Sequence, residues 1–454
     1  MKQTLKKNAG IGPVPFGVKI GYGIGDIGSN FFIVVTGFFL LYFLTDIVGV
    51  EPALAGMVLL FPKLWDVISD PIMGVISDRT STRWGRRRPY LLFGAVPFGL
   101  TFFLMFLAPG YSSELARALH VGLMFALGCT AFTVVNVPYS SMVAEMSDDY
   151  NERISITSFR MIFACVGVLL AGALAMPLVI IGGEGAGGFR FMGLVLGGAI
   201  TLLTLLCFWG TAKAKTLPRT ELTPPFREQV KIALKNYPFM MLMAGYALQS
   251  VAVGILMAGL IYFIIHVMKL PEAAMSVVLP ILFVTAIIFI PIWVKVGAKI
   301  GKIKAYRIGL MIMAVMLLSL FFSTPSQVLL FYGQVLILGI GFSSFQLFPF
   351  SMLPDTIEYD QMKSGMRREG IFAGVWTAGQ KLAYSVGPGI IGFALSLSGF
   401  TRGDVQPDSV VTGIRIAFCL FPTLLLLLSF IPFNRYDLTE ERFRDIKQII
   451  AGKK

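Results

Sequence analysis

Residues 63–74 read KLWDVISDPIMG, near the middle of an apolar run, 52–77, whose length fits one membrane crossing. An ionised carboxylate at that depth costs from about 3 to more than 10 kcal/mol, so Asp66 and Asp70 together require a cation or a basic partner. With Lys63 they follow i, i+3, i+7 spacing, which places all three side chains on one face of a helix. We therefore expect this helix to carry the functional site. The alternative is a static network of buried ion pairs.

The composition is that of an integral membrane protein. The 454 residues have a mean hydropathy of +0.77, and 56% are hydrophobic while only 14% are charged, far from the mixture found in soluble domains. The net charge of +13 does not indicate nucleic-acid binding, because the basic residues gather in alternate short loops between apolar runs. All four cysteines lie inside apolar runs without a CxxC pair, which predicts packing residues rather than ligands or disulfides.

Twelve apolar runs are candidates for membrane spans, and they predict an all-α polytopic membrane protein with 12 transmembrane helices. The polar stretch 212–236 divides the runs six and six. We therefore expect an N-terminal six-helix bundle over 1–211, a cytoplasmic linker over 212–236, a C-terminal six-helix bundle over 237–434 and a cytoplasmic tail over 435–454. The runs cover roughly 17–44, 52–77, 89–109, 118–143, 154–181, 190–211, 237–267, 273–297, 303–323, 328–353, 370–398 and 410–434.

The distribution of basic residues predicts the orientation. An even number of spans places both ends of the chain on one side of the membrane, and the positive-inside rule makes that side the cytoplasm. The N-terminus is polar and runs into a long span without a small-residue cleavage site, so it predicts a first transmembrane helix rather than a removed signal. The basic residues on the expected cytoplasmic side are Lys2, Lys6 and Lys7, those of the 79–88 loop, those of the linker and tail, and the group 299–307.

The two halves repeat one pattern, which indicates a duplicated six-helix unit. The second copy has Ala286 and Ile290 where the first has Asp66 and Asp70. Because the backbone pattern repeats without the charge, the carboxylates are expected to serve a site rather than the scaffold. The matching segments are Pro71-Ile72 with the following basic loop against Pro291-Ile292 with its own, and 138–140 against 349–351, at offsets of 220 and 211 residues.

Other polar side chains within the spans extend the constellation. Arg160 and Lys381 could neutralise Asp66 and Asp70 when the site is empty. Asp26 would then be the odd charge, without a cation to balance it. Lys381 lies near the middle of its span, which favours function over snorkelling to an interface. Arg160 is nearer the end of its span, where anchoring and function are equally open. The remaining polar candidates are Tyr22 and Asn30 in the first span, and Thr133 and Asn136 in the fourth.

The chemistry of this cluster suits a monovalent cation. Two carboxylates with Ser69 between them, and the Thr133 hydroxyl from a neighbouring helix, could replace the hydration shell of such an ion. Calcium and magnesium usually require more oxygen ligands or retained waters, whereas a proton needs only one carboxylate. The sequence contains no catalytic triad, phosphate-cradling loop or metal-ligand spacing. We therefore expect no enzyme and no cofactor other than a coupling ion, either a monovalent cation or a proton.

Five motifs together resemble the glycoside-pentoside-hexuronide:cation symporter family of the major facilitator superfamily, over nearly the whole chain. They are YGIGD at 22–26, WDVISDPIMG at 65–74, RWGRRRP at 83–89, VPYS at 137–140 and SMLPD at 351–355. The resemblance implies two six-helix bundles around a central cavity with alternating access, in a bacterial cytoplasmic (inner) membrane, and we expect a monomer. It also implies cation binding at Asp66 and Asp70, with Thr133 matching a cation ligand of the melibiose carrier.

The resemblance further implies a gate and a substrate region. Asp78, Arg79, Arg86 and Arg87 resemble the superfamily's cytoplasmic gating motif, in which charges bridge helices in one conformation and release in the other. We expect the substrate to meet Tyr22, Asp26, Asn30, Asn136, Arg160 and Lys381.

The substrate itself stays open between classes. Asn30 and Asn136 stand where the melibiose carrier has Asp, Ser140 replaces its sugar-stacking Trp and Ser69 replaces an Asn, so the resemblance does not imply a galactoside. Lys381 and two of the motifs also resemble the sodium-dependent lysophospholipid symporter branch. We expect a cation-coupled importer of a glycoside, uronate or related small organic solute, with Na+ as the first candidate ion and H+ or Li+ as alternatives. The alternatives are a Na+-coupled lysolipid symporter or flippase and an H+-coupled sugar symporter, while a membrane sensor or enzyme is disfavoured.

Overall fold

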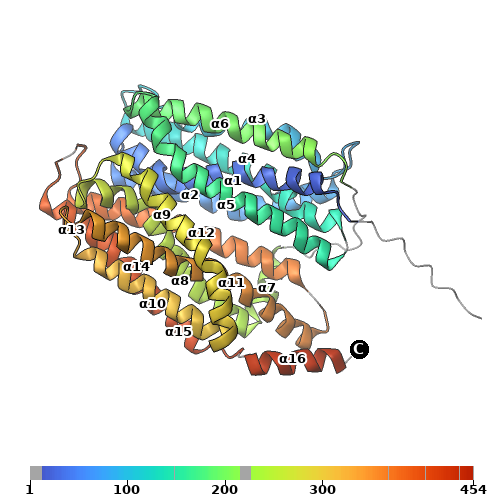
Figure 1. Cartoon of the computed structure of the whole chain (residues 1–454). Coiled ribbons are helices and arrows are strands. Elements are labelled where there is room, and N and C mark those ends of the chain that lie inside the picture. Colours follow the sequence, from blue (N-terminus) through green and yellow to red (C-terminus); the bar gives the residue numbers. More distant parts are fainter. Residues whose placement is uncertain are drawn as a thin grey trace, which may run out of the picture.

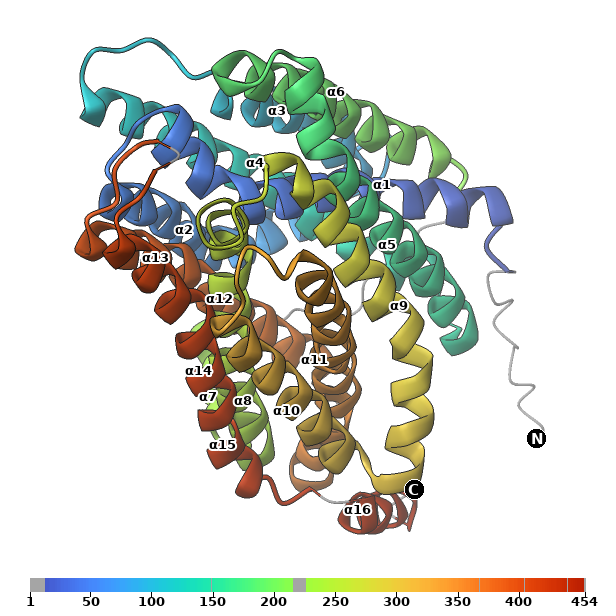
Figure 2. The same cartoon turned by 60° about the vertical axis from the view of Figure 1, so that its left-hand side comes forward.

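The computed structural model describes residues 13–147, 149–214, 226–366, 368–403, 405–438 and 440–452, and in these ranges the chain forms helices and no strand. Figures 1 and 2 show the helices of the first half, blue to green, grouped on one side, and those of the second half, yellow to red, on the other. The predicted all-α polytopic fold is confirmed. Lys2, Lys6, Lys7 and residues 215–225 of the expected linker lie outside the described residues.

The first half contains six long helices, and each matches one predicted span to within a few residues. Helix α1 continues into a π-helical turn, η1. The six are α1 (Phe16–Tyr42) with η1 (Phe43–Ile47), α2 (Pro52–Arg79), α3 (Arg88–Met105), α4 (Glu114–Met146), α5 (Tyr150–Ile181) and α6 (Gly185–Gly210).

The second half repeats this layout, including a π-helical turn, η2, at the end of its first long helix. Its last span is divided into four short helical pieces. The elements are α8 (Tyr237–Tyr262) with η2 (Phe263–Val267), η3 (Glu272–Ala274), α9 (Met275–Ile300), α10 (Lys302–Phe321), α11 (Val328–Ser364), α12 (Glu369–Ser398), α13 (Asp408–Arg415), η4 (Ile416–Leu420), α14 (Phe421–Leu428) and α15 (Phe430–Asn434).

Local signals explain several helix ends. Glu51 accepts a hydrogen bond from the Leu54 amide at 2.9 Å, directly before a proline that opens α2. Asp149 and Asn236 cap α5 and α8 in the same way. Gly365 ends α11 in the left-handed conformation, with φ of +73°.

The sequence predicts some helices too short, because an apolar run shows where a helix crosses the bilayer and not where the helix ends. Helix α11 was expected to stop at 353 but continues to Ser364 through a polar segment. Two short amphipathic helices, α7 (Phe226–Leu234) and α16 (Glu440–Gly452), lie within the ranges expected as linker and tail. In the described chain eleven helices are long and apolar enough to span a bilayer. Helix α12 is not among them, although its 30 residues would suffice in length, because it carries Gln380 and Lys381 near its middle.

The two halves pack together along α2 and α12 and along α5 and α9, and at one end of the molecule hydrogen bonds join them as well. There η1 meets α8 through a 2.6 Å hydrogen bond between Thr45 and Tyr262, and Tyr42 donates a hydrogen bond to Glu272. Arg402 donates to the Ile47 carbonyl oxygen at 3.0 Å. From this end the ribbons of the two halves diverge toward the end that carries α16, as Figure 2 shows.

Within the first half, α3 and α6 approach so closely that their contact requires glycine. A Cβ added at Gly197 would lie 2.6 Å from the Gly99 carbonyl oxygen, whereas one added at the adjacent Gly198 would meet nothing within 4 Å. We predict that Gly197→Ala lowers the free energy of unfolding by about 1–3 kcal/mol through overpacking, and that Gly198→Ala leaves it unchanged or raises it slightly. Thermal unfolding of the purified protein in one detergent checks both. Equal midpoints for the two variants would contradict this packing.

Candidate functional site

Asp70 lies on α2 where helices of both halves meet. Its Oδ1 accepts a hydrogen bond from the Thr133 hydroxyl of α4 at 2.8 Å, and its Oδ2 lies 2.5 Å from Nζ of Lys381 on α12. Both charged side chains are about one-fifth exposed, so they are screened less than a surface pair would be. Asp70 thus joins α2 and α4 of the first half to α12 of the second.

Asp66 lies one turn before Asp70 and is fully buried, at 0% exposure. Its nearest opposite charge is Nζ of Lys63, 3.6 Å from Oδ2, and that ammonium also lies 5.3 to 5.4 Å from the ring centres of Phe125 and Phe32. Neither carboxylate oxygen of Asp66 accepts a hydrogen bond from any described residue. A buried carboxylate without a donor is rare, and it keeps lone pairs available for a cation or a proton.

Ser69 is buried between these carboxylates, but its hydroxyl donates to the Asp66 backbone oxygen at 3.4 Å. Asn136 is half-buried one turn beyond Thr133 on α4. The structure therefore joins Thr133 to Asp70 and places Asp66 one helical turn away, while the Ser69 hydroxyl is taken up by the helix backbone. A cation site at these residues stays a prediction.

Arg160 on α5 pairs with Asp26 on α1, Nε to Oδ2 at 3.1 Å. The expectation that Arg160 balances an α2 carboxylate and leaves Asp26 as the odd charge is therefore wrong, whereas the expected pairing of Lys381 with one of these carboxylates is confirmed at Asp70. Lys63 takes the place assigned to Arg160, since it neighbours Asp66 within the same helix. Sequence spacing placed Lys63 on the right face but could not tell which cation of a distant helix reaches which carboxylate.

An aromatic pair adjoins the Asp26–Arg160 pair. The rings of Tyr22 and Tyr139 stack with centroids 4.6 Å apart, and each hydroxyl donates to the other residue's backbone oxygen, at 3.1 and 2.8 Å. The Arg160 guanidinium lies 5.1 Å from the Tyr139 ring centre, and Asn30 donates to the Asp26 backbone oxygen at 2.8 Å. Tyr22 is thus fully buried as a support for α1 against α4, and its hydroxyl is occupied.

The charges of the region balance. Lys63, Lys381 and Arg160 pair with Asp66, Asp70 and Asp26 respectively. A cation that binds at the α2 carboxylates therefore adds one positive charge to a neutral cluster, and its arrival weakens the attraction that Asp70 exerts on Lys381.

A second charge cluster lies at the diverging end of the first half. Arg87, at the start of α3, bridges Glu145 of α4 at 2.6 Å and Asp78 of α2 at 2.8 Å, and Arg86 lies 3.0 Å from Glu145. Arg79 is exposed. Three of the four expected gating residues therefore join one network, and Glu145, which the sequence did not single out as a site residue, belongs to it as well.

The second half has a counterpart of this cluster. Lys302, at the start of α10, lies 2.7 Å from Asp355 of α11, in the positions that correspond to Arg87 and Glu145. Each half also has an arginine near the start of its third helix that donates to a backbone oxygen of its last span: Arg88 to Phe208 and Arg307 to Phe433, both at 2.8 Å. These pairs support the predicted duplication.

Comparison with known proteins gives consistent matches over nearly the whole chain. The profile of the family described as MFS/sugar transport protein matches residues 21–440. An uncharacterized symporter of Synechocystis sp. is 29% identical, with 96% of this chain and 97% of that one covered. A glucuronide carrier protein homolog of Escherichia coli is 26% identical (96% and 95%), and a sodium-dependent lysophosphatidylcholine symporter of Xenopus tropicalis is 25% identical (95% and 89%).

Solved structures show the same fold. A bacterial homolog of the human lysosomal transporter Spinster, in an inward-facing and unoccupied conformation, superposes with a TM-score of 0.69 at 13% identity and covers 95% of this chain and 97% of its own.

The network around Arg87 yields a stability prediction. Arg87→Gln removes both of its ion pairs, with Asp78 and with Glu145, so it should lower the free energy of unfolding by about 3 kcal/mol, the low end for breaking a buried pair. Arg79→Gln, one residue from Asp78 but exposed, serves as the matched control and should change it by less than about 0.5 kcal/mol. Thermal unfolding in detergent measures both, and equal losses would refute the bridging role.

Proposed function

Because the chain belongs to the MFS/sugar transport protein family, we propose that it is a symporter that couples the entry of a cation, Na+ first, to the import of a glycoside, uronate or related small organic solute. The protein is a multi-pass integral membrane protein, and its family consists of transporters rather than enzymes. The finer parts of the proposal, which are the ion and the substrate, rest on the site geometry.

One observation carries the proposal: Asp70 is held at once by Thr133 of its own half and by Lys381 of the other half. A cation that takes Asp70 as a ligand competes with the Lys381 ammonium for the same oxygens. Ion binding at this position therefore acts directly on a link between the two halves, whose relative movement is what alternating access requires.

The neighbouring Asp66 supplies the second carboxylate of the proposed ion site. Its oxygens are buried and receive no hydrogen bond from a described residue, so a dehydrated cation gains two anionic ligands one helical turn apart, with Thr133 close by. These hard oxygen ligands suit Na+ or Li+. A proton could also use Asp66 alone, which is why H+ is kept as the alternative ion.

The substrate class follows from the charge balance. When a cation compensates Asp70, the freed Lys381 ammonium can meet an electronegative or anionic group of the substrate, with Arg160, Asp26, Asn30 and Asn136 as further polar contacts. A uronate satisfies this arrangement best. The relative named as a glucuronide carrier protein homolog supports that class, while the relative named for lysophosphatidylcholine makes lysolipids the rival to test.

Transport by purified protein in proteoliposomes tests the proposal. Gradients of Na+, Li+ and H+ are imposed one at a time, with a neutral glycoside, a glucuronide and a lysophosphatidylcholine as substrates. We expect Na+-driven accumulation of the glucuronide. Accumulation of lysophosphatidylcholine alone would establish the rival, and uptake that no ion gradient accelerates would refute symport.

The two carboxylates give the first transport prediction. Asp70→Asn and Asp66→Asn should each abolish Na+-driven accumulation and weaken Na+ binding by about a hundredfold or more, because losing one partner of a buried charge pair costs about 3–5 kcal/mol. Asp408→Asn, which alters an exposed carboxylate at the start of α13, is the control and should transport normally. Unchanged Na+ dependence in either α2 variant would remove the proposed site.

Lys381 gives the second transport prediction. If it passes from Asp70 to the substrate when the cation binds, each ligand must raise the affinity for the other by the same factor, at least about fivefold. In Lys381→Ala that factor should fall close to one. Calorimetric titration of Na+ with and without substrate measures it in both proteins. A factor that persists in the variant would make Lys381 a structural residue only.

A further inference from the structure

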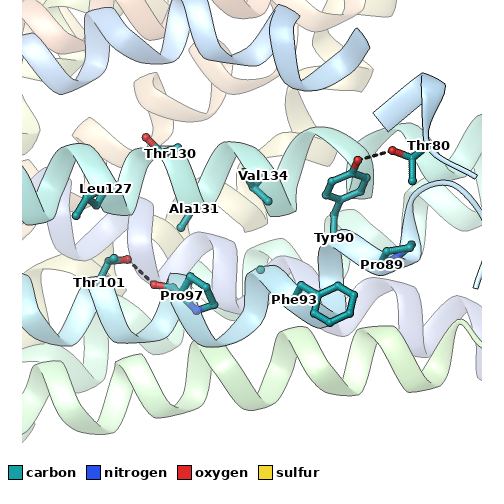
Figure 3. A pocket seen from close by; sticks show the side chains of 11 residues that line it. Thr80, Pro89, Tyr90, Phe93, Pro97, Thr101, Leu127, Thr130, Ala131 and Val134 are labelled. Carbon is teal, nitrogen blue, oxygen red and sulfur yellow. Dashed lines mark hydrogen bonds between the residues drawn. The ribbon is translucent and has the colours of Figure 1, made fainter. Parts of the chain in front are cut away.

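A groove lies on the outer face of the first half, away from the carboxylates of α2. Its volume is about 550 Å³, and Figure 3 shows its walls formed by α3 and α4 with Thr80 of the segment after α2 at one end. The lining is almost wholly apolar and includes Phe93, Pro97, Leu127 and Val134. Phe93 is 67% exposed and Leu127 45%. Apolar side chains exposed on a membrane-spanning helix face lipid, so the groove opens to the bilayer.

The length of the groove fits one leaflet. Along α3 it extends from Tyr90 to Thr101, and eleven residues of helix rise about 16 Å, half of a hydrocarbon core about 30 Å thick. The small residues Gly94 and Ala131 line it between the larger ones, which is why a furrow forms here instead of a continuous helix surface.

One end of the groove carries the chemistry of a membrane interface. Tyr90 and Thr80 hydrogen-bond to each other at this mouth. Arg79 and Arg83 are both exposed beside this mouth. The Arg83 guanidinium lies 4.2 Å from the ring centre of Trp84. The ring centres of Trp84 and Phe93, a residue of the groove, are 6.0 Å apart. Exposed arginines with interfacial aromatic rings attract anionic headgroups.

We propose that this groove binds one acyl chain of an anionic glycerophospholipid, whose phosphate meets Arg83 and Arg79. The bound acyl chain would also contact Thr130, which lines the groove. Thr130 accepts a hydrogen bond from Nε1 of Trp65 at 3.1 Å, and Trp65 directly precedes Asp66. An occupied groove therefore braces α4 against the segment of α2 that carries the carboxylates.

Native mass spectrometry of the full-length, delipidated protein with added phosphatidylglycerol tests the proposal, with phosphatidylcholine and glycerol 1-phosphate as separate arms. We expect one retained phosphatidylglycerol per protein and no binding of glycerol 1-phosphate alone. Arg83→Gln should weaken phosphatidylglycerol binding about fivefold and leave phosphatidylcholine binding unchanged. Lys299→Gln, an exposed cation on α9, should change neither.

Filling the groove tests the acyl chain separately. Val134→Trp and Leu127→Trp should each abolish the retained lipid, whereas Leu123→Trp, on the same helix but outside the lining and 58% exposed, should keep it. Two filling variants are used so that one that fails to fold does not decide the result. Retention of phosphatidylglycerol in a folded filling variant, or binding of glycerol 1-phosphate at the same strength as the lipid, would overturn the proposal.

Discussion

The ion pair between Asp70 and Lys381 is the constraint on which the arrangement depends. Two opposite charges at bilayer depth stabilise each other only while they remain together, because separating them leaves two costly ions in a medium of low polarity. This pair joins α2 of the first half to α12 of the second. The halves therefore cannot move apart at this level unless something else satisfies both charges, and a cation at Asp70 with a polar group at Lys381 would do so.

Comparison of the two halves distinguishes residues that stabilise the fold from residues that serve the proposed ligand site. Both halves have a basic residue that opens the third helix and pairs with a carboxylate on the fourth, Arg87 with Glu145 and Lys302 with Asp355. Both also have a π-helical turn at the end of the first helix. Only the first half carries carboxylates in the middle of its second helix. An element present in both copies serves the scaffold or its movement. The carboxylates that only the first copy carries are costly to remove from water, so they are best explained by a ligand.

The sequence predicted where the long helices lie because most of them are apolar enough to span a bilayer, although α12 with Gln380 and Lys381 near its middle falls short of that measure. It predicted the face that Lys63, Asp66 and Asp70 share because helical spacing fixes that face. It could not predict which cation would meet which carboxylate. Arg160 was matched to the wrong partner, since the choice depends on the distance between helices that are far apart in sequence. The extension of α11 to Ser364 was missed for a related reason: the helix continues where apolarity ends. The groove beside α3 and α4 arises from small residues in two helices and has no signature in either one alone.

At the contact end of the two halves, hydrogen bonds between side chains accompany close helix packing, since a Cβ added at Gly392 of α12 would clash with the Pro52 carbonyl oxygen of α2. There η1 meets the end of α8 through the hydroxyls of Thr45 and Tyr262, and Tyr42 reaches Glu272. A π-helical turn is a strained departure from the regular ladder that recurs at functional sites, and here it occurs at the same place in both copies. Hydrogen bonds between hydroxyls and a carboxylate can be exchanged for water at small net cost. With Asp70 and Lys381 between this end and the diverging one, a cation bound at α2, as proposed, would act directly on the link between the halves.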